Sequence, residues 1–167
     1  MKEINIMEAI AITSPNPLTL ICSEKPDGTV NLAPVGFFSY LSFNPPMIGF
    51  AMGKEAYTGN RIREIGKVIV TLPGTSLSDT VMSCGLSSGK TTDKVKEFGI
   101  ELAEIKGSTI KIPTHTKMAI VATLKQTIEV GDHYLYICDV DKFLADHTEN
   151  ALFSWDGGKK IAPIQEK

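Results

Sequence analysis

Short apolar runs separated by turn residues make up most of this chain. The run from Leu18 to Cys22 is followed by the turn sequence KPDG at residues 25–28 and then by residues 30–53, VNLAPVGFFSYLSFNPPMIGFAMG. A turn of this composition between apolar runs predicts an antiparallel hairpin. The pattern predicts further strands at residues 47–52, at 68–72 and, as two runs broken at Gly131-Asp132, across 117–140.

Helical spacing of apolar residues is confined to the middle of the chain. Residues 56–65 place apolar side chains on one helical face and end before Gly66, a typical helix stop. Ser76 and Asp79 have capping-box spacing and predict a helix through residue 84, and residues 92–99 predict another short helix. Because strands and helices do not alternate, a parallel sheet is disfavoured. The sequence predicts a mainly β fold, a closed antiparallel barrel with a few short inserted helices.

Length, composition and charge favour one domain spanning residues 1–167. With 43% hydrophobic residues, a chain of 167 residues can bury a core as a single unit. Its 17 basic and 19 acidic residues are scattered, so no basic face favours nucleic acid. No apolar run reaches the ~20 residues of a membrane span, and the sequence MKEINIMEAIAIT does not resemble a secretory signal. We therefore expect no nucleic-acid or membrane partner and a cytoplasmic location.

The cysteines and histidines do not predict a disulfide framework or a metal centre. The three cysteines are few and scattered, and Cys22 and Cys138 lie in apolar runs, as small buried hydrophobic residues do. His115 and His147 lie in polar loops without a carboxylate or cysteine at ligand spacing. We expect no metal ligands in this chain.

Residues 30–53 have the composition of a wall that contacts a flat ligand. The side-chain amide of Asn31 can hydrogen-bond to the edge of a heteroaromatic ring. Small residues after it let a ring approach the backbone, and aromatic residues then offer a π face. These residues are Ala33, Pro34, Gly36, Phe37 and Phe38. The alternative is an ordinary barrel strand. Only the presence of other ligand-binding segments in the chain can distinguish the two.

Residues 85–91, GLSSGKT, are a second candidate binding segment. Glycines expose backbone N–H groups, and the hydroxyls and the lysine can contact a phosphate. Only three residues precede Gly89-Lys90 after the first glycine, whereas a triphosphate loop has four, and no strand leads into the segment. We favour binding of one terminal phosphate at the start of the next helix, with a solvated surface loop as the alternative.

Four segments together resemble the flavin reductase-like, flavoredoxin-like proteins with an FMN-binding split barrel. They are VNLAPVGFFSYLSFNPPMIGFAMG, KEAYTGNRIREIGKVIVTLPG, MSCGLSSGKTTDKVKEFGI and GDHYLYICDV, so the resemblance covers residues 17–144. It implies a six-stranded Greek-key barrel, a homodimer and one FMN per subunit near the subunit boundary. The cofactor-binding residues that it implies are Asn31, Ala33, Pro34, Phe37, Ala51, Met52, Gly53, Thr58, Asn60, Ser87, Ser88, Gly89, Lys90 and Lys94, with Trp155 closing over the ring.

The resemblance also assigns Lys94 and His133 as catalytic residues. A cation at Lys94 would stabilise the anionic reduced ring, and His133 would orient a nicotinamide or guide a proton. From the residues alone, a lone histidine at a tight turn is more often a rim residue, and Thr58 and Asn60 resemble an N-cap and a first-turn polar residue.

This chain departs from the family pattern at three positions. Relatives often have tryptophan where Phe37 stands, arginine at Lys90 and glycine at Cys138. Lysine keeps the charge of arginine but cannot make its bidentate phosphate contacts.

The function implied by the resemblance is that of an FMN-binding oxidoreductase. Its FMN would accept a hydride from NADH or NADPH and pass electrons to free flavin, ferric iron, or a partner protein such as an oxygenase. A flavoredoxin-type carrier that does not use nicotinamides is the alternative, and the absence of a GxGxxG fingerprint weakens the case for tight nicotinamide binding. A P-loop-like nucleotide-binding protein and a non-redox FMN-binding protein are further alternatives.

Overall fold

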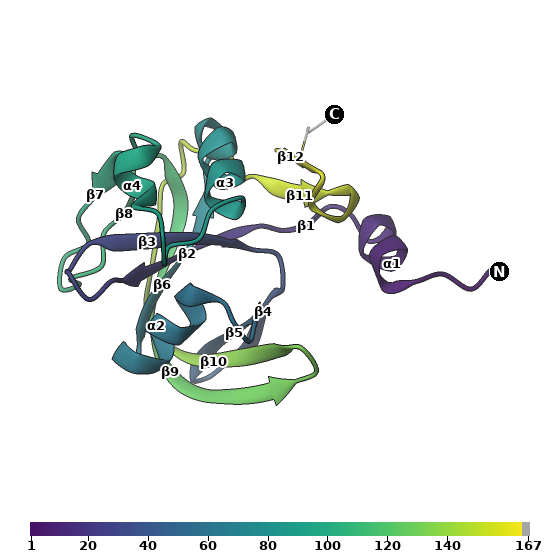
Figure 1. Cartoon of the computed structure of the whole chain (residues 1–167), viewed down its shortest axis with the longest axis horizontal. Coiled ribbons are helices and arrows are strands. Elements are labelled where there is room, and N and C mark those ends of the chain that lie inside the picture. The colour runs from purple at the N-terminus through teal and green to yellow at the C-terminus, as the bar shows by residue number, and fades with distance from the viewer. Residues whose placement is uncertain (165–167) are drawn as a thin grey trace.

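One antiparallel sheet of seven strands forms the body of the protein, which is described here by a computed structural model covering residues 1–164 (Figure 1). The strands are β2 (Thr19–Glu24), β3 (Val30–Val35), β4 (Phe38–Phe43), β5 (Pro46–Gly53), β6 (Lys67–Pro73), β9 (Thr116–Val130) and β10 (His133–Ala145). Their spatial order is β3-β2-β6-β9-β10-β5-β4, and every neighbouring pair is antiparallel. The predicted mainly β class with inserted helices is confirmed.

The main sheet has one strand more than the six that were expected. Residues 30–53 form three strands, because the chain turns after β3, where the Phe38 N–H donates to the Gly36 carbonyl (3.1 Å). It turns again before Pro46, and β4 and β5 pair as a hairpin. The predicted hairpin of β2 and β3 is confirmed, as are the two long runs β9 and β10 on either side of Gly131-Asp132.

The helices predicted in the middle of the chain are present with different starts. Helix α2 (Tyr57–Ile65) ends at Gly66, whose φ of 70° is left-handed, as predicted. The capping box at Ser76 is wrong: Ser76 lies in a 3₁₀ turn, η1 (Thr75–Leu77), and α3 (Ser78–Gly85) begins after it without a side-chain cap. The turn places Leu77 in the core, which local capping patterns do not reveal.

Helix α4 (Lys94–Glu97) is shorter than the predicted helix over residues 92–99. Asp93 caps it by accepting a hydrogen bond from the Lys96 N–H. After it the chain forms the small hairpin β7 (Leu102–Ala103) and β8 (Ile112–Pro113), which lies with α3 and α4 on one side of the sheet (Figure 1).

Side chains alternate between two hydrophobic cores on the two faces of the sheet. On β2, Leu20 and Cys22 join α3 and the residues around β8, whereas Ile21 faces the barrel interior. In that interior the rings of Phe50 and Tyr136 stack with centroids 5.2 Å apart. Cys22, Cys84 and Cys138 are all buried and free, which confirms the prediction that Cys22 and Cys138 are core residues.

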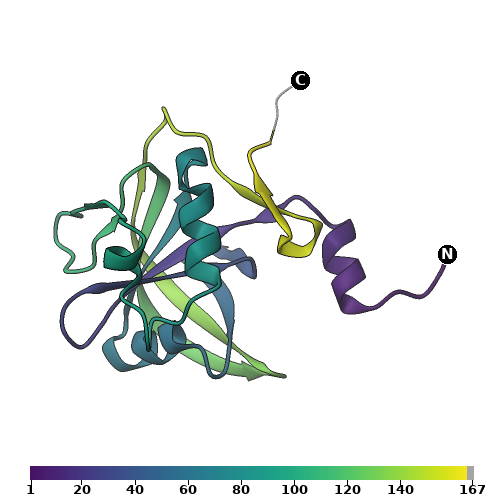
Figure 2. The same cartoon turned by 45° about the horizontal axis from the view of Figure 1, so that its top comes forward.

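Both ends of the described chain form an arm that projects from the barrel (Figures 1 and 2). We define the arm as α1 (Ile6–Ile12) together with residues 153–162, which form β11 (Phe153–Trp155), η2 (Asp156–Gly158) and β12 (Lys160–Ala162). Strand β1 (Asn16–Pro17) pairs with β11 and so joins the two ends. The sequence did not predict these elements.

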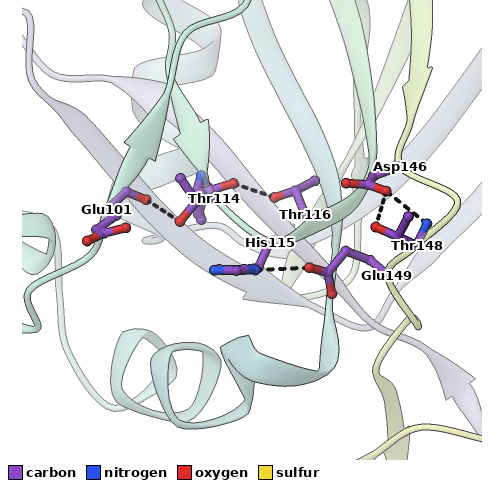
Figure 3. A network of polar contacts seen from close by, with 8 residues as sticks. Glu101, Thr114, His115, Thr116, Asp146, Thr148 and Glu149 are labelled. Carbon is purple, nitrogen blue, oxygen red and sulfur yellow. Dashed lines mark hydrogen bonds and ion pairs between the residues drawn. The ribbon is translucent and has the colours of Figure 1, made fainter.

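The segment that leads into the arm is fixed to the barrel by short-range polar contacts. His115 Nδ1 lies 2.9 Å from Glu149 Oε1, and Asp146 accepts hydrogen bonds from Thr148 at the preceding turn (Figure 3). Next to them, Gly74 pairs with Ala151. None of the helices in residues 1–164 is long and apolar enough to span a membrane.

Candidate functional site

A cavity of about 870 Å³ lies between the arm and the barrel. Its lining comes from α1, the turn between β3 and β4, β5, α3, the start of β10 and residues 154–161. Six residues predicted at the site line it together: Pro34, Phe37, Ala51, Met52, Gly53 and His133. The volume is in the range of small-molecule sites in proteins.

One wall of the cavity is flat and aromatic at its edge. Gly53 pairs with His133 across β5 and β10, and a side chain at Gly53 would meet nothing within 4 Å, so the backbone is open to a ligand there. Beside it the rings of Phe37 and His133 lie 5.6 Å apart at an angle of 52°. Phe37 is 51% exposed, as a side chain at a cavity rim is. This wall can receive a planar ring.

The lining contains no lysine, arginine, aspartate or glutamate in the part of the chain that the structure describes. The titratable side chain in this lining is that of His133. The Nδ1 atom of His133 lies 2.7 Å from the carboxylate of Asp132, a residue that does not line the cavity. This hydrogen bond lowers the pKa of the exposed Asp132 carboxyl group. The carboxylate fixes the orientation of the imidazole, so that Nε2 is the nitrogen left for a ligand.

A buried polar cluster lies under the glycine-rich loop. Asn31 is 1% exposed, and its amide nitrogen donates to the Thr58 hydroxyl (2.7 Å) and more weakly to Ser23 (3.4 Å). Its carbonyl oxygen, Oδ1, has no hydrogen-bond partner within residues 1–164. Gly89 covers this oxygen so closely that a Cβ at position 89 would collide with it and contact Tyr57. The cluster therefore has an acceptor without a partner, and it lies beneath position 89 of the loop, where only glycine fits.

The glycine-rich loop offers hydroxyl and amine donors at the surface. Ser88 and Lys90 are exposed, and the Ser88 carbonyl accepts the N–H groups of Thr91 and Thr92 (3.1 and 2.9 Å), which closes a tight turn. The phosphate position at the start of the next helix stays a prediction, and there the carboxylate of Asp93 caps the four-residue α4. The loop itself, with Ser87, Ser88 and Lys90, remains the candidate phosphate site.

Lys94 does not line the cavity. It is 4% exposed, and its Nζ donates to the carbonyls of Leu32 (2.8 Å) and Cys84 (2.7 Å). Burial lowers the pKa of this ammonium group. Lys94 thus ties β3 to the end of α3, and the structure does not bring it together with the cavity wall.

The other predicted residues outside the cavity lining are Asn31, Thr58 and residues 87–90, described above, and Ala33, Asn60 and Trp155. Ala33 packs against the core of the barrel interior. Asn60 lies on α2 and accepts a hydrogen bond from Arg63. Trp155 belongs to the arm, where its Nε1 donates to the Ala162 carbonyl (3.2 Å), although its neighbours Ser154 and residues 157–158 do line the cavity.

Sequence reasoning missed the lining residues contributed by the arm, by residues 13–18 and by α3 with Leu86 after it. They are mostly apolar: Met7, Ile10, Thr13, Asn16, Leu18, Val81, Met82, Leu86, Ser154, Gly157, Gly158 and Ile161. The signal available for α1 was the spacing of Ile6 and Ile10 behind Asn5, which accepts a hydrogen bond from the Glu8 N–H in a capping box. Nothing local showed that this helix lines the same cavity as α3.

The residues present are compatible with FMN. An open wall edged by Phe37 and His133 suits the isoalloxazine, and a loop with hydroxyls and a lysine suits the phosphate. The unpaired Oδ1 of Asn31 is an acceptor for which a ligand could supply the donor. In the described residues no group of three or more His, Cys, Asp or Glu side chains could hold a metal ion.

Solved structures with this fold define a class of flavin reductase-like split barrels. Flavoredoxin from Methanosarcina acetivorans superposes with a TM-score of 0.85 at 21% identity, covering 100% of this chain and 92% of that one. Nitrilotriacetate monooxygenase component B from Bacillus cereus superposes with a TM-score of 0.87 at 17% identity, covering 100% and 97%. The fold of this chain is the fold of that class.

The chain belongs to the family described as "Flavin reductase like domain", which matches residues 12–162. It is 28% identical to a flavin reductase from Pseudomonas putida over 145 residues, 86% of this chain and 81% of that protein. It is also 29% identical to an uncharacterized protein from Archaeoglobus fulgidus over 119 residues, 70% of this chain and 64% of that protein. The resemblance found in the sequence is confirmed.

Proposed function

We propose that this chain binds FMN and acts as an oxidoreductase that takes a hydride from NADH or NADPH and passes the electrons to a second acceptor. The observation that carries the proposal is the cavity wall of Phe37, Ala51, Gly53 and His133 beside a glycine-rich loop. The name of the Pseudomonas putida relative, a flavin reductase, supports it.

Each part of the site has a role in this proposal. Bound FMN supplies a ring that accepts a hydride and releases electrons. Phe37 and the open backbone at Gly53 position that ring, and Asn31 Oδ1 accepts a hydrogen bond from the ligand. Ser87, Ser88 and Lys90 bind the phosphate. Lys94 fixes β3 to the end of α3 by donating hydrogen bonds to the Leu32 and Cys84 carbonyls. His133, held by Asp132, orients the nicotinamide or moves a proton at Nε2.

A flavoredoxin-type electron carrier is the second candidate function. One observation favours it: the cavity lining in residues 1–164 carries no lysine or arginine that could pair with the phosphates of a dinucleotide. In this case the electrons would come from another redox protein.

Two measurements test the proposal. Titration of the purified chain with FMN, followed by the change in flavin absorbance and fluorescence, should show saturable 1:1 binding. Anaerobic mixing of the loaded protein with NADH or NADPH should then bleach the flavin absorption within seconds. Failure to bind FMN rejects both functions, whereas binding without bleaching rejects the nicotinamide-dependent one and leaves the carrier.

We also propose that two chains associate through the outer face of β9 and β10. Val130 pairs with His133 and Ile128 with Leu135, so these side chains share one face, on which Ile128 and Val130 are 37% and 43% exposed. Light scattering should report a dimer, and Ile128→Lys should shift it to a monomer, while Lys125→Glu, at an exposed position on the same strand, should not. A wild-type monomer would contradict this proposal.

A further inference from the structure

We propose that the arm side of the cavity binds a second ligand, an uncharged quinone ring, and that quinones are the class of compound that receives the electrons. The choice of acceptor rests on the proposed flavin function. The binding site rests only on the residues between the arm and α3.

The cavity has two chemically different sides. The barrel side is the wall of Phe37, Ala51, Gly53 and His133 described above. The arm contributes Met7, Ile10 and Ile161 to the lining, and α3 with the residue after it contributes Met82 and Leu86. Met7, Met82 and Leu86 are 62%, 40% and 86% exposed, so this side of the cavity is open to solvent. The thioethers of the two methionines are flexible and polarizable, and they make favourable contacts with ring systems.

The absence of charge in the lining decides which acceptors fit. In the described part of the chain no charged side chain other than a protonated His133 could pair with a charged ligand inside the cavity. An anionic ligand would therefore gain no ion pair with the lining in this part of the chain, whereas in water it keeps its full hydration. An anionic ferric chelate or a second flavin phosphate is therefore disfavoured, whereas an uncharged ring loses little hydration and gains apolar contact.

One buried polar group on the arm side suits a quinone carbonyl. Ser154 is 8% exposed and lines the cavity. A hydroxyl in this position can donate to a carbonyl oxygen of a ligand. Few polar groups in an apolar cavity fix the orientation of a ring without adding charge.

The electron transfer is balanced with one proton from water. The quinone would take up one hydride from the reduced flavin and one proton from the solvent, which together carry two electrons and two hydrogens. The products are the hydroquinone and the oxidised flavin, which NADH or NADPH then reduces again.

The test uses two probes that differ in charge, with and without FMN on the protein. The uncharged probe is 2,3-dimethyl-1,4-naphthoquinone, and the charged one is 1,4-naphthoquinone-2-sulfonate. Calorimetry should show binding of the uncharged probe to both protein forms, and at least about tenfold weaker binding of the sulfonate. The fluorescence of Trp155, the single tryptophan, should change in parallel because it lies in the arm.

Variants on α1 and in the arm locate the binding site. Ile10 lines the cavity, whereas Ile12 of the same helix is 72% exposed and does not, so Ile10→Glu and Ile12→Glu add the same charge in two environments. We expect Ile10→Glu to weaken naphthoquinone binding by at least about tenfold and Ile12→Glu to leave it unchanged. Ser154→Ala should weaken it by about fivefold, the effect of one lost hydrogen bond. Thermal unfolding checks that the variants are folded.

The outcomes separate this inference from the proposed function. FMN binding without naphthoquinone binding overturns the second site and leaves the flavin function intact. Naphthoquinone binding without FMN binding rejects the flavin function and the acceptor role but keeps the cavity site. Equal affinity for both probes, equal effects of Ile10→Glu and Ile12→Glu, or displacement of FMN by naphthoquinone overturns the inference.

Discussion

Lys94 shows how burial changes the role that a residue type suggests. A lysine beside a glycine-rich loop predicts a cation for the ligand, yet its buried Nζ donates to two main-chain carbonyls. We predict that Lys94→Met destabilises the protein by about 1–3 kcal/mol, because both buried carbonyls lose their donor. Urea unfolding measures this effect, and Lys96→Met, at an exposed position on the same helix, should change stability by less than about 0.5 kcal/mol. Unchanged stability with a lowered flavin potential would instead support the role predicted from the sequence.

His133 lines the cavity, and its predicted catalytic role stays a prediction. Its position beside Phe37 and its contact with Asp132 place an oriented imidazole at the cavity rim. We predict that His133→Ala slows reduction of bound FMN by NADH or NADPH by at least about tenfold while FMN affinity stays the same. Stopped-flow bleaching measures the rate, and Asp132→Asn should have a smaller effect because it keeps the imidazole. An unchanged rate in His133→Ala would make the histidine a turn residue only.

At the scale of elements, the glycine-rich loop depends on its contact with β3. Gly89 lies directly on Asn31, so any side chain at position 89 must push the loop away from the polar cluster. We predict that Gly89→Ala weakens FMN binding by at least about tenfold, since the loss of one ordered phosphate contact costs more than 1.4 kcal/mol, roughly a factor of ten. Flavin fluorescence titration measures it.

A second variant separates the collision from a general loss of flexibility. In the double variant Asn31→Ala/Gly89→Ala the colliding oxygen is gone, and we expect it to bind FMN no more weakly than Asn31→Ala alone. If the two substitutions weaken binding independently, the loop does not act through Asn31.

The helix and strands of the arm could not be predicted from local sequence patterns. Helix α1 has a capping box and apolar residues at helical spacing, but none of its side chains is buried, and the tail strands are only three residues long. Elements this short have little propensity of their own. They form here because β1 pairs with β11 and the ends of the described chain meet.

At the scale of the whole molecule, the three buried thiols link stability to pH. Burial raises the pKa of Cys138 to about 12, whereas an unfolded thiol ionises near 9.0, and burial also raises the pKa of Cys22. Between these two values the unfolded chain holds fewer protons than the folded one. The stabilisation is therefore full below about pH 9 and falls by about 1.4 kcal/mol per pH unit for each thiol above it.

The fall in stability with rising pH can be measured on the flavin-free protein. The stability difference between the wild type and Cys138→Ala, measured by urea unfolding, should shrink by about 2 kcal/mol between about pH 8 and about pH 10.5. The comparison isolates one thiol, because all other groups titrate in both proteins. A difference that does not change with pH would mean that this thiol ionises equally in the folded and unfolded chains.

The sequence by itself determined the class of fold, the positions of most main strands along the chain and the family, and it predicted six of the residues that line the barrel side of the cavity. These features depend on local patterns, namely turn residues, alternation along strands and small residues such as Ala51 and Gly53 beside aromatic ones. Only the tertiary structure decided that the main sheet has seven strands, that Lys94 donates to main-chain carbonyls and that Asn31 lies under Gly89. It also decided that the arm lines one side of a cavity whose lining, within residues 1–164, has no Lys, Arg, Asp or Glu. These features depend on contacts between segments far apart in the chain, and no local pattern records where such segments meet.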